Sequence, residues 1–329
     1  MEYQRNKHYR LRASQYALIP WLLRRFLRGL ALWMIACFVL YLLLELLPGD
    51  AATQLVGKDG PEAVQKARAE MGLDQPWLMR YISWLRGLLQ GDLGHSLASR
   101  VPVARLMAKP LLATLLVSGI VVVALILITI PASLLLGYQR SRMTSLVSAG
   151  AITISALPEF VTGIIMMGVL CIGARILPVL SVPGPNQSVW DRPITLVLPA
   201  LILWLTCSAG IFRRVRAMVS TYASSAYVRE AELAGLSHMR VLCFHLLPTI
   251  RGGIGQLLAQ NIPYLLGGAV VVEFVTSFPG MGLTLTMAIA NRETPIIMGI
   301  CALLMLVFVL FYTFADLPSK SNERITAVL

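Results

Sequence analysis

Two features of this sequence place polar groups where apolar residues would be expected. The first is a pair of carboxylates, Glu159 and Glu273, each set within or at the end of a long apolar stretch. Inserting a charged group near the middle of a bilayer costs about 2.5–3.5 kcal/mol, so such a residue marks a functional site or a buried partner. The second is the segment YVREAELAGLSHMRVLCFHLLP, residues 227–248, a polar helix-forming pattern between two apolar stretches. A helix of this kind is suited to contact a protein outside the membrane.

The chain lacks the residue patterns of the common catalytic sites. It contains no Gly-x4-Gly-Lys-Ser/Thr loop, so we do not expect it to hydrolyse ATP by that mechanism. Its four histidines and five cysteines are scattered without the spacing of metal ligands. We therefore predict that the chain is not an enzyme and has no cofactor or metal site of its own. A membrane enzyme, with convergent polar groups on neighbouring spans, and a gated channel, with no docking surface for a motor, remain the alternatives.

Composition identifies the class of protein to which these residues belong. Of 329 residues, 57% are hydrophobic and only 13% are charged, and the mean hydropathy is +0.73. A soluble domain carries roughly 25% charged residues. The apolar residues come in continuous runs of the length that a membrane-spanning helix needs. The sequence therefore predicts an all-α polytopic membrane protein.

Six apolar runs define the predicted spans, with the third containing Glu159 and the fifth ending at Glu273. Their predicted bounds are residues 26–47, 111–137, 145–172, 194–212, 253–275 and 296–315. The formal net charge is +12, which we attribute to membrane topology and attraction to anionic lipid, with no nucleic-acid partner.

Basic residues are distributed unevenly between the two sides of these spans. They gather in residues 1–28 and 213–251, whereas two short loops on the other side contain only Arg175, Arg192 and Arg292. Because basic loops stay in the cytoplasm, both termini are predicted to be cytoplasmic. The predicted organisation is a cytoplasmic N-terminal segment (1–25), a first span (26–47), a large outer loop (48–110), a core of five spans (111–316) that includes a cytoplasmic loop (213–251), and a cytoplasmic tail (317–329).

The outer loop is predicted to contain amphipathic helices. Pro61 and Glu62 follow Gly60 as a helix start, and aromatic and leucine residues recur at helical spacing from Trp77 to Leu88. Such a helix can lie in the membrane interface, or the loop can form a small outer subdomain that packs on itself. The pattern leaves both possibilities open.

The segment 227–248 reads as two short helices joined by a turn. Gly235 can supply the left-handed residue that ends the first helix, and Ser237 can cap the second. Small residues at Ala231, Ala234 and Gly235 would let another protein surface come close. We interpret the segment as a docking site for a cytoplasmic partner, with a helix lying at the lipid headgroups as the alternative.

Pro158 and Glu159 stand near the middle of the third predicted span. The proline frees a carbonyl group and can kink the helix at this point. Glu159 can face a cation in a translocation path, or it can form a salt bridge with an arginine of a neighbouring subunit. The sequence alone does not separate these two roles.

Several motifs, taken together and in order, resemble those of a known family. They are LLRRFLRGLALWMIACFVLYLLLELLPGD (22–50), MGLDQPWLMRYISWLRGLLQGDLGHSL (71–97), LPEF (157–160), LVLPALIL (196–203), YVREAELAGLSHMRVLCFHLL (227–247) and VVEFVTSFPGMG (271–282). The chain is similar to the permeases of dipeptide, oligopeptide and nickel ABC importers. It resembles the first permease of such systems, because a large outer loop follows the first span.

The resemblance implies a MetI-like ABC importer permease core in a prokaryotic inner membrane. It implies a second homologous permease, two cytoplasmic ATPases that bind ATP and Mg²⁺, and a periplasmic solute-binding protein. The cargo would be di- or oligopeptides, with nickel or a metal chelate (a metallophore or opine complex) as the alternative.

The resemblance also assigns roles to individual residues. Segment 227–248 would be the coupling region that docks in an ATPase, through Tyr227, Arg229, Glu230, Ala231, Ala234, Gly235, Ser237 and Arg240. The outer gate and docking region would include Glu273, Pro279, Gly280 and Gly282, with an interfacial carboxylate of no special role as the alternative for Glu273. Pro248 departs from the family pattern, so we expect the second coupling helix to end before it.

Overall fold

The computed structural model describes residues 2–139, 142–182 and 189–315, with side chains described over 23–139, 142–182 and 189–311. Over these ranges the chain is helical, and the single β-bridge joins His95 to Pro102. The all-α prediction is therefore confirmed. The expected tail, residues 317–329, lies outside the described residues.

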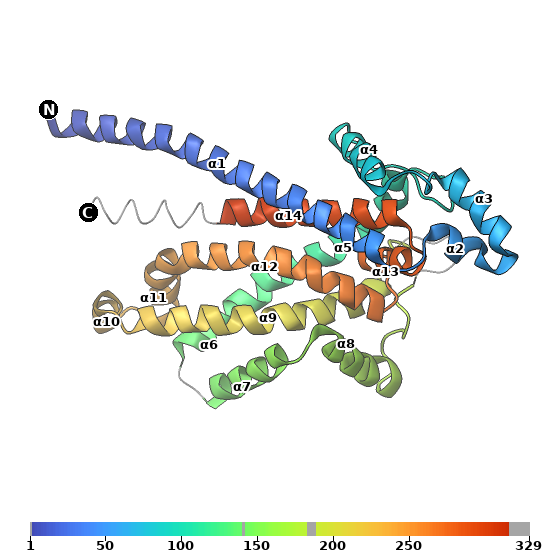
Figure 1. Cartoon of the computed structure of the whole chain (residues 1–329). Coiled ribbons are helices and arrows are strands. Elements are labelled where there is room, and N and C mark those ends of the chain that lie inside the picture. Colours follow the sequence, from blue (N-terminus) through green and yellow to red (C-terminus); the bar gives the residue numbers. More distant parts are fainter. Residues whose placement is uncertain (1, 140–141, 183–188, 316–329) are drawn as a thin grey trace.

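Long helices run along the bundle, and short helices lie at its two ends (Figure 1). They are α1 (Glu2–Leu46), α2 (Ala51–Val56), α3 (Pro61–Met71), α4 (Trp77–Leu89), α5 (Val103–Ala124), α6 (Ile130–Tyr138), α7 (Arg142–Ala156), α8 (Glu159–Met167), α9 (Ile194–Ala223), α10 (Ala226–Leu233), α11 (His238–Val241), α12 (Leu247–Val275), α13 (Met281–Ala290) and α14 (Thr294–Ala315). A 3-10 turn (Gly57–Asp59) precedes α3, and π-helical turns extend three helices at Leu125–Thr129, Gly168–Gly173 and Leu242–Leu246.

Five of the continuous helical segments are long and apolar enough to cross a membrane. Helices α7 and α8 pass the same test together but are bent by 111° at the break between them, so they form either one broken span or a re-entrant loop. The predicted kink at Pro158 is a full break, because α7 ends at Ala156 and α8 begins at Glu159. Proline lacks the N–H that would continue the hydrogen-bond ladder across residue 158. The described helices agree with six spans if α7 and α8 count as one.

Several helices extend past the predicted ends of their membrane spans. The helix that contains the second predicted span begins at Val103, before the predicted start at residue 111, and Pro110 lies within it. Helix α9 continues to Ala223, and α12 begins at Leu247, so helices also occupy both ends of the predicted loop 213–251. Hydropathy alone does not reveal where a helix continues past its apolar stretch.

Helix α9 lies at the centre of the bundle and packs against α5, α6, α7, α8 and α12. Its fully buried side chains include Leu198, Ile202 and Ile211, which belong to the largest apolar core. Small residues allow close approach nearby: a Cβ added to Gly137 of α6 would lie 3.0 Å from Val219. This packing fixes the helices that continue into the cytoplasmic segment.

The outer loop packs on the bundle through helix α4. Tyr81 is buried in a cluster with Trp33, Tyr41 and residues of α14, while Met79 and Leu89 on other faces of α4 are exposed. Arg80 also forms an ion pair with Glu45 of α1 at 2.6 Å. Helix α4 thus packs on α1 and α14 through one face and exposes apolar side chains on another. The exposed apolar side chains leave a position in the membrane interface open for this helix.

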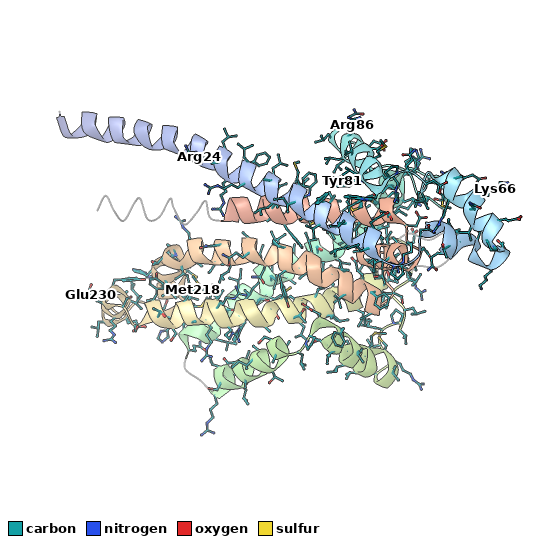
Figure 2. All side chains as sticks on the ribbon, in the orientation of Figure 1. Arg24, Lys66, Tyr81, Arg86, Met218 and Glu230 are labelled. Atoms are coloured by element: carbon teal, nitrogen blue, oxygen red, sulfur yellow. The ribbon has the colours of Figure 1, made fainter. Side chains whose placement is uncertain are left out.

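The short helices gather at opposite ends of the bundle. The start of α1, the end of α14, and α10 with α11 lie at one end, and α2, α3, α4 and α13 lie at the other (Figure 1). Glu230 of α10 and Lys66 of α3 mark these two ends (Figure 2). The first end is therefore the one that the distribution of basic residues predicts to be cytoplasmic.

Candidate functional site

Helix α10 is held on the bundle by one narrow apolar face. Val228 is fully buried and Ala231 nearly so, and both belong to the large apolar core that also contains Val241 and Leu246. Ala231 therefore packs inward, and the expectation that it would let another protein come close was wrong. Its small side chain lets α10 pack closely on the bundle.

A Schellman motif ends α10. The amide of Gly235 donates to the Glu232 carbonyl at 3.0 Å, and the amide of Leu236 donates to the Ala231 carbonyl at 3.2 Å. This geometry requires a left-handed residue at Gly235, whose φ is +80°. The predicted role of Gly235 is confirmed.

The second helix begins at Ser237 and continues into the membrane. Ser237 occupies the N-cap position, but its side chain makes no capping hydrogen bond, so that part of the prediction was wrong. Residues His238–Val275 form one continuous helical segment, which also contradicts the expected end before Pro248. The π-helical turn absorbs the proline: the Leu247 amide donates to the Leu242 carbonyl, five residues back, and Pro248 occupies the first turn of α12.

Polar contacts tie the segment to two neighbouring helices. The Tyr138 hydroxyl at the end of α6 donates to the Glu232 carboxylate, and its ring packs edge-on against His238 with the ring centroids 5.5 Å apart. The Tyr227 hydroxyl donates to Thr249 Oγ1 of α12 at 3.4 Å. Helices α10 and α11 are thus braced against the bundle, so displacement of α10 transmits force to α6 and α12.

The outward surface of the segment is polar with one large apolar side chain at its tip. Of the predicted docking residues, Tyr227, Arg229, Glu230, Ala234, Gly235, Ser237 and Arg240 are all exposed. The sequence interpretation missed Leu233, which ends α10 and is 87% exposed. An apolar residue surrounded by polar ones and out of phase with Val228 and Ala231 was the available signal. An exposed leucine at the tip of a polar segment has the character of a protein contact.

Glu159 lies where α8 begins, beside α9 and α12. A Cβ added to Gly268 of α12 would lie 3.6 Å from a Glu159 carboxylate oxygen, and the Tyr264 hydroxyl of the same helix lies near this carboxylate. No lysine or arginine of the described residues pairs with Glu159. The carboxyl group is half-buried, and Pro158 before it is exposed. This arrangement can present carboxyl and hydroxyl oxygens together to a cationic group.

Glu273 is fully buried at the outer end of α12. Its carboxylate accepts hydrogen bonds from the Thr114 hydroxyl and from the Gly282 amide, both at 2.6 Å. Thr114 Oγ1 in turn accepts from the Met281 amide at 2.9 Å. The carboxylate therefore sits at the N-terminus of α13, where a negative charge is favoured, and joins α5, α12 and α13. Because it is buried, Glu273 cannot itself touch an external protein in this conformation.

The neighbouring glycines are required by this cluster. A Cβ on Gly280 would lie 2.3 Å from the Glu273 carboxyl carbon, and one on Gly282 would lie 2.3 Å from Val270 Cα. Pro279 lies between the fully buried Phe278 and Gly280, and its side chain is partly exposed. The predicted gate residues are thus brought together, although Glu159 belongs to a separate site on α8.

Glu293 is a second buried outer carboxylate, and the sequence interpretation missed it. Its carboxylate accepts from Ser96 Oγ at 2.9 Å and from the amides of Leu97 and Ala98 at 2.8 and 3.0 Å. These bonds clamp the end of the outer loop onto the turn before α14. An acid next to Arg292 in a short loop was the signal, but it does not reveal a partner about 200 residues away in the chain.

Asp50 anchors the beginning of the outer loop. Burial alone would raise its pKa, but hydrogen bonds from the Thr53 amide and hydroxyl and from Arg68 outweigh it, so the pKa lies below the usual aspartate value. The Arg68–Asp50 pair is 2.6 Å long. Stability from these contacts is present above the pKa of an unfolded aspartate and is lost as the pH falls through the folded value. The outer loop is therefore fixed at neutral pH.

The fold is that of a multi-pass membrane protein with a short polar helical segment exposed at one end of the bundle. Comparison with protein families gives the particular family. Residues 129–320 match the binding-protein-dependent transport system inner membrane component, and residues 18–136 match the N-terminal membrane component of the same systems. The chain belongs to this family of transport permeases. A transport permease is not itself an enzyme, and the family implies a solute-binding protein and ATPase partners.

Two relatives are similar over nearly the whole chain. One is the "Probable peptide ABC transporter permease protein" of Sinorhizobium fredii, 30% identical over 300 residues, which are 90% of this chain and 96% of the relative. The other is the dipeptide transport system permease protein DppB of Escherichia coli strain K12, 26% identical over 299 residues, which are 83% of this chain and 88% of the relative. The similarity extends through both the outer loop and the core.

Proposed function

We propose that this chain forms one half of the path through which an ATP-driven importer brings dipeptides or short oligopeptides into a prokaryotic cell. Two relatives that match most of the chain carry peptide transport in their names. The structural observation that carries the proposal is α10, which is anchored by Val228 and exposes Leu233 at the end of the bundle. A channel or a membrane enzyme has no use for such a docking element.

The assembly we propose contains a second homologous permease, two cytoplasmic ATPases and a periplasmic binding protein. ATP and Mg²⁺ bind to the ATPases, and each permease contributes one docking segment. Exposed apolar side chains on α1, on the π-helical turn after α5 and on α8, such as Leu32, Leu127 and Ile164, support a location against lipid and against the sister permease. Copurification from native membranes, with quantified subunits, tests this stoichiometry.

The orientation we propose places α10 and both termini in the cytoplasm of an inner membrane. A native residue tests it: Cys243, just after α11, is an exposed free thiol. A membrane-impermeant maleimide should label Cys243 in inverted vesicles and not in cells whose outer membrane alone is permeabilised. Cys243→Ser is the control that identifies the labelled site. Labelling from the outside would overturn the orientation and with it the docking role.

Glu159 and Tyr264 are the proposed binding groups for the positively charged end of the cargo. Losing a hydrogen bond to a charged group costs roughly 1.5–3 kcal/mol, about ten-fold or more in affinity. Glu159→Gln should therefore raise the half-saturating cargo concentration for transport by reconstituted importer about ten-fold. If Glu159 instead pairs with an arginine of the sister permease, the same variant should weaken subunit assembly and leave the affinity for cargo unchanged.

The identity of the cargo is tested directly by uptake. Cells that lack this chain should lose uptake of a labelled dipeptide, and the chain supplied in trans should restore it. Uptake of labelled nickel is measured in the same cells. Loss of nickel uptake with normal dipeptide uptake would reject the peptide proposal in favour of a metal or metal-chelate cargo.

A further inference from the structure

A cavity of about 650 Å³ lies at the predicted cytoplasmic ends of α6, α7 and α9. Three arginines line it: Arg142 begins α7, and Arg213 and Arg216 lie on α9. None of the described residues that line it carries a carboxylate. Three guanidinium groups without a neutralising acid, around a space of this size, form a site for an anion.

A chain of hydrogen bonds holds the inner part of this site in place. Arg216 Nη1 donates to Ser148 Oγ at 2.5 Å, and Ser148 Oγ donates to the Thr144 carbonyl at 2.6 Å. Thr144, which is buried, donates through Oγ1 to the Gln139 carbonyl at 2.9 Å. Arg216 is therefore oriented before any ligand arrives, whereas Arg142 and Arg213 form no ion pair within the described part of the chain.

The depth of the cavity matches that of the lipid headgroups. The apolar part of α9 from Ile194 through Phe212 rises about 28 Å at 1.5 Å per residue. The hydrocarbon core of a bilayer is about 30 Å thick. Arg213 and Arg216 follow this apolar part directly, so they lie at the level of the phosphate groups on that side of the membrane.

An exposed apolar surface leads away from the cavity into the hydrocarbon. Met143 and Leu146, in the first turns of α7, are 66% and 74% exposed. They follow Arg142 along the same helix, so an acyl chain can lie on them while its phosphate is held by the arginines. A soluble anion would make no use of this surface.

We propose that the cavity lined by Arg142, Arg213 and Arg216 binds the phosphate group of an anionic phospholipid of the cytoplasmic leaflet. This inference goes beyond peptide import and requires only that these helix ends face the cytoplasm. The lipid would contact both α7 and α9, whose residues line the cavity. The site is next to the docking segment, because Gly137 and Ser220 also line a second cavity, which is bordered by Arg229 and Glu232 of α10. A bound lipid therefore stabilises the position of the bent span α7–α8 relative to α9.

The test uses the full-length chain purified in mild detergent and returned to nanodiscs of phosphatidylcholine and phosphatidylglycerol in equal amounts. After a second extraction, the phosphatidylglycerol retained per protein is measured by native mass spectrometry. Arg213→Gln and Arg142→Gln should each lower its retention about ten-fold, the cost of one charge-assisted contact. The matched control is Arg214→Gln, which removes the same charge from α9; the Arg214 guanidinium lies beside Gly210 and does not line the cavity.

The control should change retention by less than about two-fold, and thermal stability in detergent identifies any variant that fails to fold. Equal loss in all three variants would show general surface attraction and overturn the site. Displacement of phosphatidylglycerol by millimolar inorganic phosphate or glycerol phosphate would assign the arginines to a soluble anion. Unchanged lipid retention with weakened binding of the ATPases would assign them to an acidic protein surface. Failure of peptide uptake affects none of these readings.

Discussion

Truncation of Leu233 is the most direct test of the docking segment. Full burial of a leucine side chain contributes about 1.5–3 kcal/mol. Leu233 is 87% exposed, so nearly all of this free energy is available to a partner and almost none is used within the permease. Leu233→Ala removes most of the side-chain carbons and should cost the complex roughly 1–2 kcal/mol. That difference corresponds to an affinity for the ATPase that is about five- to thirty-fold weaker.

The assay is a titration of fluorescent ATPase subunits onto permease complexes held in nanodiscs. Stimulation of ATP hydrolysis by the loaded binding protein is measured on the same samples. The matched control is Leu89→Ala, because Leu89 is 76% exposed and ends α4 at the opposite end of the bundle. Leu233→Ala should fold normally, since the Leu233 side chain contributes little to the permease core. An unchanged affinity with Leu233→Ala, at protein concentrations near the dissociation constant, would refute the reasoning that this exposed leucine is a contact.

Three further predictions test the local geometry at Gly235, Gly282 and Thr114. Gly235→Asn should preserve ATPase binding, whereas Gly235→Val should weaken it and speed hydrogen exchange at Leu236, because a β-branched residue is strained at a φ of +80°; equal exchange in both variants would contradict the Schellman assignment. Gly282→Ala should lower the free energy of unfolding by about 1–3 kcal/mol, because the added methyl group would clash with the Val270 backbone. The control is Gly255→Ala on α12, where a Cβ meets nothing within 4 Å, and it should be neutral or stabilising. Thr114→Val should cost about 1–3 kcal/mol by leaving the Met281 amide unpaired, and a double-mutant cycle with Glu273→Gln should show a coupling of about 0.5–3 kcal/mol; simple additivity would show that the two residues do not act together.

Some local features were predictable from a few neighbouring residues, although the Ser237 cap and the helix end before Pro248 were not. The αL residue at Gly235 was predicted from the backbone freedom of glycine, and a kink was predicted at Pro158, where the helix breaks completely. The apolar spans followed from hydropathy, apart from the question of whether α7 and α8 count as one. These features need no knowledge of what lies elsewhere in the fold.

Features set by distant partners were not predictable in the same way. Glu273 was recognised as a candidate, but its partners Thr114 and Gly282 come from two other helices. Glu293 was missed because its role depends on the loop at Ser96. Ala231 was listed as a docking residue, but the apolar face that it shares with Val228 packs on the bundle, and a short helix does not by itself specify which partner covers that face. The sequence thus predicts where polar groups are unusual, and the tertiary packing decides what each one touches.

One continuous helix connects the docking segment to the buried outer carboxylate. The helix from His238 to Val275 has 38 residues and is therefore about 57 Å long. At one end the Tyr227–Thr249 contact links it to α10, and at the other Glu273 links it to α5 and α13. Its first turns contain a glycine-rich stretch that could bend, but Ile250 and Ile254 are buried in the core there. If α10 docks an ATPase as proposed, a push on it would reach the outer cluster as movement of this helix, in which Pro263 is the position that can bend, and would not be absorbed by a flexible loop.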